Sequence, residues 1–139
     1  MRGLLGISAG VLLSVSLHAQ TAPPSPPPAS PPTYDVRVEL NQVNTGTTTF
    51  IVDKAGKVTG TMHLDDPNVV DATLGGTVKD GVWTFEYGFS MSAQGCSGTS
   101  TGTGKVSADQ AMVTGTLTVS GGCTSQPQMG TFTFTKRVK

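Results

Sequence analysis

Apolar and polar residues alternate along most of the chain after residue 33, in eight short segments. The clearest segment is 82–91, VWTFEYGFSM, in which every second residue from Trp83 to Met91 is large and apolar, while the residues between them are smaller or polar. Successive side chains of a strand point to opposite faces, so this spacing predicts a β-strand with one buried face. The same alternation predicts seven further strands, at 34–41, 47–53, 57–64, 69–78, 98–107, 112–119 and 130–137.

The apolar residues on one face of each segment form the predicted core. Aromatic rings of 82–91 and branched aliphatic side chains of the other segments supply most of it. The expected members are Val36, Val38, Leu40, Phe50, Val52, Val58, Met62, Leu64, Val70, Ala72, Leu74, Val78, Trp83, Phe85, Tyr87, Phe89, Met91, Val106, Val113, Leu117, Val119, Phe132 and Phe134. We expect the aromatic rings to fill the interior, because a domain of this size has little material with which to enclose an empty space.

Short polar or glycine-bearing loops separate the segments. Asp80-Gly81 lies between two predicted strands and is a strong signal for a tight hairpin. Short loops place sequence neighbours side by side, which predicts an antiparallel meander. Because helix formers are scarce, the apolar face must be covered by the sheet itself. The predicted fold class is therefore all-β, an eight-stranded up-and-down barrel, with a two-sheet sandwich as the alternative.

The two cysteines, Cys96 and Cys123, are expected to form a disulfide. If Val106 pairs with Met112 across the intervening turn, the cysteines are one residue out of register. A bulge near 121–122 would then bring them together. In the chain-entropy model, closing a loop of about 28 residues stabilises the fold by about 3.6 kcal/mol.

Composition supports the all-β prediction and narrows the range of partners. Between residue 33 and the end of the chain lie 20 threonines, and glutamate occurs only twice; this favours strands over helices. The formal net charge is zero, and the basic residues are scattered apart from Lys136, Arg137 and Lys139. Binding to nucleic acid requires clustered basic charge, so no nucleic-acid partner is expected.

The first residues have the layout of a signal peptide of bacterial type. Arg2 is a positive n-region, 3–17 is a mostly apolar h-region, and Ala19 is the small residue before the expected cleavage site. Spanning a bilayer takes about 20 apolar residues. This stretch is shorter, so we expect no membrane span after signal cleavage and a secreted or periplasmic protein.

A proline-rich stretch follows the leader. Residues 23–32 contain seven of the nine prolines, which predicts a solvated polyproline II spacer about 30 Å long. The expected organisation is therefore a signal peptide at 1–19, a disordered linker at 20–33 and the barrel domain at 34–139.

The sequence contains no pattern that is typical of a catalytic or metal site. After the leader, His63 is the only histidine, and the alternation places it on the outer face of its strand. Glu39 and Glu86 are also outward, so neither a nucleophile beside a base nor a pair of facing carboxylates is predicted. We therefore expect a non-enzymatic protein without a cofactor or metal.

Binding residues are expected in the loops at the rim of the barrel. The candidate loops are 65–68, 92–97 and 121–129. Their polar candidates are Asp65, Asp66, Asn68, Gln94, Gln126 and Gln128.

Three stretches carry a family resemblance. These are Asp53-Lys54-Ala55-Gly56-Lys57-Val58-Thr59-Gly60-Thr61, then 76–85 (GTVKDGVWTF), and the ending 130–137 (GTFTFTKR). Over 34–138 the chain resembles exported bacterial Gly/Thr-rich β-meander domains of unassigned function. The resemblance implies a small β-barrel and supplies no catalytic residues.

Together these features predict an exported module that binds a protein, a glycan or a small ligand through its rim loops. The alternative is a structural or surface domain, held away from a larger assembly by its linker and without a discrete ligand.

Overall fold

The computed structural model describes residues 22–24, 26 and 29–138, and within this part of the chain it contains strands and no helix. The predicted signal peptide lies outside the described residues. The nine strands are β1 (Thr33–Glu39), β2 (Val43–Val52), β3 (Val58–Asp66), β4 (Val70–Leu74), β5 (Thr77–Lys79), β6 (Val82–Met91), β7 (Cys96–Val106), β8 (Met112–Gly121) and β9 (Gln128–Lys136).

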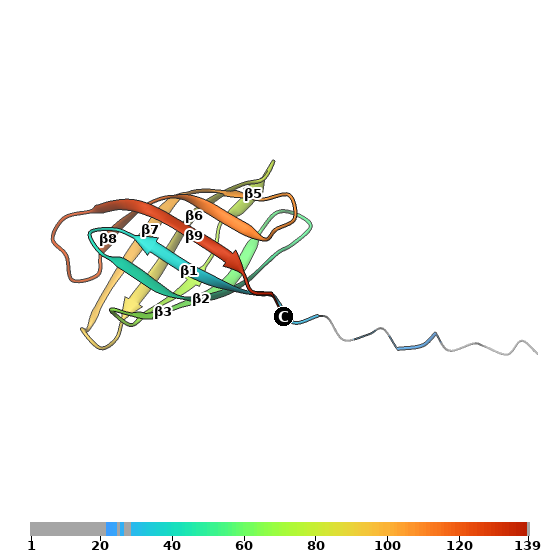
Figure 1. Ribbon diagram of the computed structural model, residues 1–139, viewed down its shortest axis with the longest axis horizontal. Coiled ribbons are helices and arrows are strands. Elements are labelled where there is room, and N and C mark those ends of the chain that lie inside the picture. Colours follow the sequence, from blue (N-terminus) through green and yellow to red (C-terminus); the bar gives the residue numbers. More distant parts are fainter. Residues whose placement is uncertain (1–21, 25, 27–28, 139) are drawn as a thin grey trace, which may run out of the picture.

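The strands form a closed antiparallel barrel (Figure 1). Apart from β4 and β5, strands that are neighbours in sequence pair with each other. β1 also pairs with β9, and β4 pairs with β6 to complete the cylinder. Eight strands make up the barrel, and the short β5 adds to the edge of β6. The predicted up-and-down barrel is confirmed, and the sandwich alternative is not what forms. Closure pairs the strands all the way round, so the barrel itself leaves no long open sheet edge.

The predicted strand at 69–78 is interrupted and becomes β4 and β5. Both parts keep one register along β6, where Ala72 pairs with Phe89 and Thr77 pairs with Thr84. The break lies at Gly75 and Gly76. The Gly75 carbonyl accepts a hydrogen bond from the Trp83 indole N–H at 2.9 Å, and Gly76 has a φ of +100°. A buried indole N–H needs an acceptor, and the glycine pair supplies one by leaving the strand conformation.

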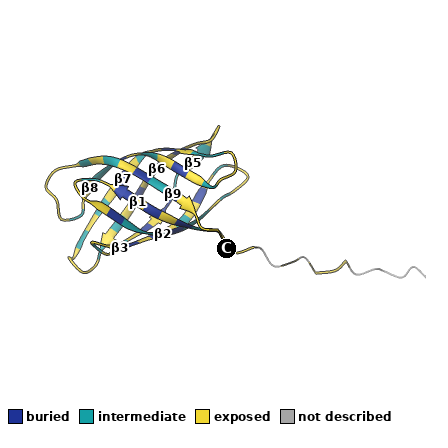
Figure 2. Ribbon diagram, viewed as in Figure 1, coloured by how far each residue is buried: buried dark blue, intermediate teal, exposed yellow. Residues whose placement is uncertain are grey.

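The core follows the predicted alternation (Figure 2). Trp83, Phe85 and Tyr87 are all buried on the inner face of β6, while Thr84 and Glu86 between them are exposed. Tyr34 is buried as well, at 1% exposure, because it continues the inward row of β1. The interior of the barrel is therefore the hydrophobic core, and the outer surface carries the threonines and charges.

The inner faces of β6 and β7 are complementary in size. Along β6 the inward residues Trp83, Phe85, Tyr87 and Phe89 are all aromatic. Their cross-strand partners on β7 are Gly104, Gly102, Ser100 and Gly98. A Cβ at Gly102 or Gly104 would approach a phenylalanine ring to 2.8 Å. The glycines thus make room for rings in a narrow barrel, and Ser100 is the exception among them.

The barrel has two unlike ends. The loops 53–57, 80–81 and 107–111 lie at one end, called here the closed end. The loops 40–42, 67–69, 92–95 and 122–127 lie at the other, called the mouth. The N-terminal segment enters β1 at the closed end, and the C-terminal residues leave there too, since the Arg137 N–H donates to the Thr33 carbonyl. The mouth therefore faces away from the proline-rich segment.

The turn between β7 and β8 differs from the prediction by one residue. Val106 pairs with Val113 rather than with Met112, so six residues separate the paired positions instead of five. Asp109 explains the longer loop, because its carboxylate accepts hydrogen bonds from the Ser107 hydroxyl and the Ala111 N–H. These bonds also lower the pKa of Asp109, the one from Ser107 most.

This register brings the cysteines together without the predicted bulge. Cys96 and Cys123 occupy opposite positions in the continued β7–β8 register, and no register shift interrupts the pairing of these strands. The two residues form a disulfide, with their Cα atoms 5.4 Å apart. The predicted disulfide is confirmed, and the expected bulge near 121–122 was wrong because the extra residue lies in the turn at the other end of the hairpin.

Candidate functional site

The mouth half of the barrel contains a cavity of about 400 Å³. Residues from all four mouth loops and from all eight strands of the barrel line it. They are Val38, Leu40, Asn41, Gln42, Asn44, Met62, Leu64, Asn68, Val70, Tyr87, Phe89, Met91, Gln94, Ser100, Leu117, Val119, Gly121, Gly122, Cys123, Thr124 and Gln128. The expectation that the interior would be filled is therefore wrong for this half of the barrel. The physical reason is that β7 contributes only the small side chain of Ser100 to this part of the interior.

Most of the cavity wall is apolar. Val38, Met62, Leu64 and Leu117 are buried core residues that line its inner part. Phe89 and other partly buried side chains continue the wall toward the mouth. A pocket of this size and composition is typical of small-molecule sites, which are concave, mainly apolar and contain a few placed polar groups.

Two hydroxyl groups lie at the inner end of the cavity. Ser100 and Tyr87 are cross-strand partners, exposed by only 2% and 8%. Burial raises the pKa of Tyr87. The two side chains are close, yet their geometry makes no hydrogen bond. Among the described residues, Ser100 Oγ is the one buried side-chain oxygen or nitrogen left without a hydrogen-bond partner.

An unsatisfied buried hydroxyl is costly, and buried polar groups in native proteins are normally paired. The fully buried Thr48 shows the usual arrangement, because its hydroxyl donates to the Thr61 carbonyl at 2.8 Å. Ser100 is equally buried but faces the cavity instead of a backbone acceptor. A ligand group is one way to supply the missing hydrogen bond.

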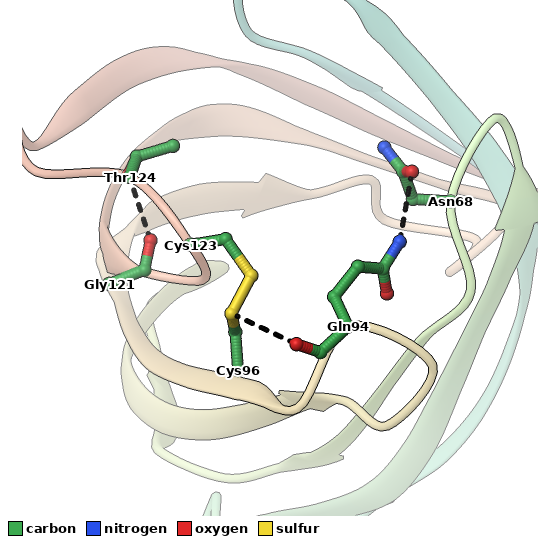
Figure 3. Close-up of a disulfide and its surroundings, with 6 residues drawn as sticks. All are labelled: Asn68, Gln94, Cys96, Gly121, Cys123 and Thr124. Atoms are coloured by element: carbon green, nitrogen blue, oxygen red, sulfur yellow. Dashed lines mark hydrogen bonds between the residues drawn. A yellow bond between two sulfur atoms is a disulfide. The ribbon is translucent and has the colours of Figure 1, made fainter.

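Carboxamide side chains surround the mouth. Gln94 Nε2 donates to Asn68 Oδ1 at 3.2 Å, which joins the β6–β7 loop to the β3–β4 loop (Figure 3). On another side, the Asn44 amide donates to the Gln42 carbonyl at 3.3 Å. Gln128 also lines the cavity. Amide groups offer donors and acceptors without charge.

The disulfide forms part of the same rim (Figure 3). Cys123 lines the cavity and follows Gly121 and Gly122, and all three have positive φ values. The Cys96 sulfur lies 3.6 Å from the Gln94 carbonyl, a contact without a hydrogen bond because a disulfide sulfur carries no proton. The covalent link thus anchors the β8–β9 loop to the start of β7, beside Gln94.

The structure separates the predicted binding residues into two groups. Asn68, Gln94 and Gln128 line the cavity, as members of three different mouth segments. Asp65, Asp66 and Gln126 are exposed and do not line it. Asp65 belongs to a shallow groove on the outer surface of the barrel. The three predicted loops do lie at one end of the barrel, where the loop at 40–42 joins them.

Several cavity residues were not predicted. Tyr87 was expected in the core rather than in a site, and Ser100 was not singled out. Asn44 precedes the strand as it was predicted, because the alternation is weak at the start of β2. A polar residue at an inward position was the available signal for both Asn44 and Ser100. A polar residue at such a position indicates a site only when the pairing of the strands is known.

His63 lies on the outer face, as predicted, and has a partner there. Its Nδ1 is 2.6 Å from Asp71 Oδ1, and this hydrogen bond is the main cause of the raised pKa of His63. Asp71 pairs across the strands with both His63 and Ser90. The Asp71 carboxylate therefore lies between His63 and Ser90. A base that activates a serine must lie beside that serine, so this arrangement does not place His63 to activate Ser90.

In residues 22–24, 26 and 29–138, no three His, Cys, Asp or Glu residues gather as metal ligands would. The same residues include no helix long and apolar enough to cross a bilayer.

Comparisons with known proteins found no match among protein-family models, curated proteins or solved structures. The resemblance to exported bacterial Gly/Thr-rich domains stays a prediction.

Proposed function

We propose that the protein is an exported binding module that holds one small molecule in the cavity at the mouth of its barrel. The observation that carries this proposal is the 400 Å³ cavity itself, with an apolar wall and an unpaired hydroxyl at its inner end. Small-molecule pockets occupy about 300–1,000 Å³, and an eight-stranded barrel is just wide enough to hold one small ligand. The disulfide agrees with an oxidising location outside the cytoplasm.

The size of the cavity bounds the size of the ligand. A dry cavity of about 150 Å³ binds benzene, so the cavity of about 400 Å³ at the mouth suits a molecule of about two to three rings. The four mouth loops leave the site open at the end opposite the proline-rich segment. A ligand could therefore enter while the linker attaches the barrel elsewhere.

A fluorescence titration with N-phenyl-1-naphthylamine tests this proposal, because this neutral dye brightens in apolar sites. We expect saturable binding with one dye per protein. Val119→Trp should weaken the binding at least about tenfold, because the indole would occupy the cavity. Leu40→Trp should also weaken dye binding, because it places an indole at the rim of the cavity.

Ser120→Trp is the matched control, since Ser120 is the next residue of β8 and is exposed on the outer surface. This variant should bind the dye like the unmodified protein. Thermal unfolding followed by circular dichroism shows whether each variant is folded. Equal loss in the folded Val119 and Ser120 variants, or no saturable binding by the unmodified protein, would favour a structural domain without a discrete ligand.

A further inference from the structure

The inner end of the cavity is defined by the deepest lining residue on each strand. On β6 and β7 these are Tyr87 and Ser100, because Phe85 and Gly102, the next inward residues, do not line the cavity. Leu117 and Met62 are the deepest lining residues of β8 and β3. Below this level the ring of Phe85 stacks on that of Tyr87, with centroids 5.3 Å apart. The floor is thus aromatic, with two hydroxyl groups at its edge.

These two hydroxyl groups interrupt an otherwise apolar pairing. The other inward aromatic residues of β6 are phenyl or indole rings that face glycines of β7, and Met91 faces Cys96. Only Tyr87 faces a residue with a side-chain oxygen. Alanine at position 100 would leave no unsatisfied polar atom. Ser100 instead leaves a buried hydroxyl without a partner, an arrangement with a free-energy cost that a ligand can remove.

The cavity contains no charge. None of its lining residues, all of which belong to the described part of the chain, is Asp, Glu, Lys, Arg or His. Asp65 and Asp66, which lie at the mouth end of β3, are exposed and do not line the cavity. A charged ligand group would lose its hydration in this site without gaining a counter-ion, which is strongly unfavourable.

Resting on the proposed function, we propose that the ligand is an uncharged, mainly apolar molecule that enters with a hydroxyl group first, and that Ser100 and Tyr87 bind this hydroxyl. A hydroxyl both donates and accepts a hydrogen bond, so it can satisfy one protein hydroxyl as a donor and the other as an acceptor. The apolar body lies against Leu117 and Met62. The carboxamides of Asn68 and Gln94 surround its outer end.

The depth of the site agrees with a ligand of two rings. Ser100 is four residues along β7 from Cys96 at the rim. At about 3.4 Å per residue, this corresponds to about 14 Å of strand. A rod-like molecule with a hydroxyl at one end can therefore reach the floor while its other end remains at the mouth.

Competition against the bound dye by four molecules of one shape tests the chemistry. The probes are biphenyl, 4-phenylphenol, 4-phenylbenzoate and 4-phenylbenzylammonium. We expect 4-phenylphenol to bind about fivefold more tightly than biphenyl, as one net hydrogen bond provides. Both charged probes should bind at least about tenfold more weakly than 4-phenylphenol.

Two variants assign the effect to the hydroxyl pair. Ser100→Ala and Tyr87→Phe should each reduce the advantage of 4-phenylphenol over biphenyl to about twofold or less, while biphenyl itself binds as before or more tightly. Thr48→Val is the control, because Thr48 is equally buried but does not line the cavity. The control should keep the full preference for 4-phenylphenol.

The outcomes separate this inference from the proposed function. If the dye and biphenyl bind but 4-phenylphenol gains nothing, or if Ser100→Ala leaves its advantage unchanged, the hydroxyl-first inference is wrong and the binding module stands. Tighter binding of the benzoate or the ammonium than of the phenol would also overturn it. If the dye and all four probes fail to bind, the proposed function itself fails.

Discussion

The closed end and the mouth of the barrel are built from the same eight strands, yet only the closed end is filled. At the closed end Phe50, Trp83, Phe134 and neighbouring valines leave a space of only about 10 Å³, against about 400 Å³ at the mouth. The difference arises from side-chain size, because the aromatic rings of β1, β2 and β9 lie nearest the closed end. One end can therefore stabilise the fold while the other remains open.

The loops at the two ends of the barrel also differ in the interactions that hold them. At the closed end the Tyr34 hydroxyl donates to the Gln110 carbonyl at 2.7 Å, and Asp53 accepts hydrogen bonds from two loop N–H groups. At the mouth, a side-chain hydrogen bond between Gln94 and Asn68 and the disulfide connect the loops. In the chain-entropy model this link stabilises the fold by constraining the unfolded chain, and in the folded protein it joins the β8–β9 loop to the start of β7.

The largest expected contrast is between two phenylalanines. Phe134→Ala should lower the free energy of unfolding by about 3–5 kcal/mol, because it creates a cavity in the filled end. Phe89→Ala should cost less than about 2 kcal/mol, since the half-buried Phe89 already borders an empty space. Urea denaturation followed by Trp83 fluorescence measures both. Equal losses of unfolding free energy in the two variants would show that the two ends contribute equally to stability.

Removal of the disulfide is the next largest effect. The double variant Cys96→Ala/Cys123→Ala should lose about 3.6 kcal/mol of unfolding free energy, as expected for a closed loop of about 28 residues. Hydrogen exchange should show the loss of protection concentrated in the mouth loops, with Val106 and Val113 at the closed end still protected. A uniform loss over both ends would contradict the proposed role of the link.

Removing either of two buried hydroxyl groups should change the stability less, and in opposite directions. Thr48→Val should destabilise the ligand-free protein by about 0.5–1.5 kcal/mol, because it removes a satisfied hydrogen bond. Ser100→Ala should leave the stability unchanged or raise it, because the hydroxyl has no partner. Thermal unfolding of both variants tests the comparison, and destabilisation by Ser100→Ala similar to that of Thr48→Val would mean that Ser100 is satisfied.

The smallest effect is on pH dependence. The lowered pKa of Asp109 means that its contribution to closed-end stability is present above about pH 3.8 and is lost as the pH falls through its folded pKa. A carbon NMR titration should show this pKa, and Ser107→Ala should raise it toward its ordinary value.

The titratable residue in the cavity is Tyr87, with a raised pKa. Dye binding should therefore stay constant between about pH 5 and pH 9, and a step within that range would indicate a charged group at the mouth.

Much of the fold could be predicted because its signal is local. The Asp80-Gly81 turn forms as predicted, with φ values of +53° and +74° at its two residues. The inward rows on β6 and β9 also follow from alternation alone. The division of 69–78 could not be predicted in this way. It depends on the Trp83 indole, a partner from another strand, taking the Gly75 carbonyl as its acceptor.

The candidate site was only partly predictable for the same reason. Asn68, Gln94 and Gln128 were identified as polar loop residues, and the structure brings them to one cavity. Asp65 and Asp66 had the same polar loop character, but the end of β3 directs them outward. Polarity in a loop is visible in the sequence. The side of the rim on which a residue lies depends on how each strand is positioned in the closed barrel.

The amino-acid sequence by itself determined the strands, the face that each strand buries and the need for that face to close on itself, because a period of two residues is a local property of an extended chain. The tertiary structure alone decided where the interior is full and where it is empty. That outcome depends on which side chains meet across the strands. Ser100 becomes an unpaired hydroxyl in a cavity only because β7 lies between Tyr87 and Val119, residues far from it in the chain.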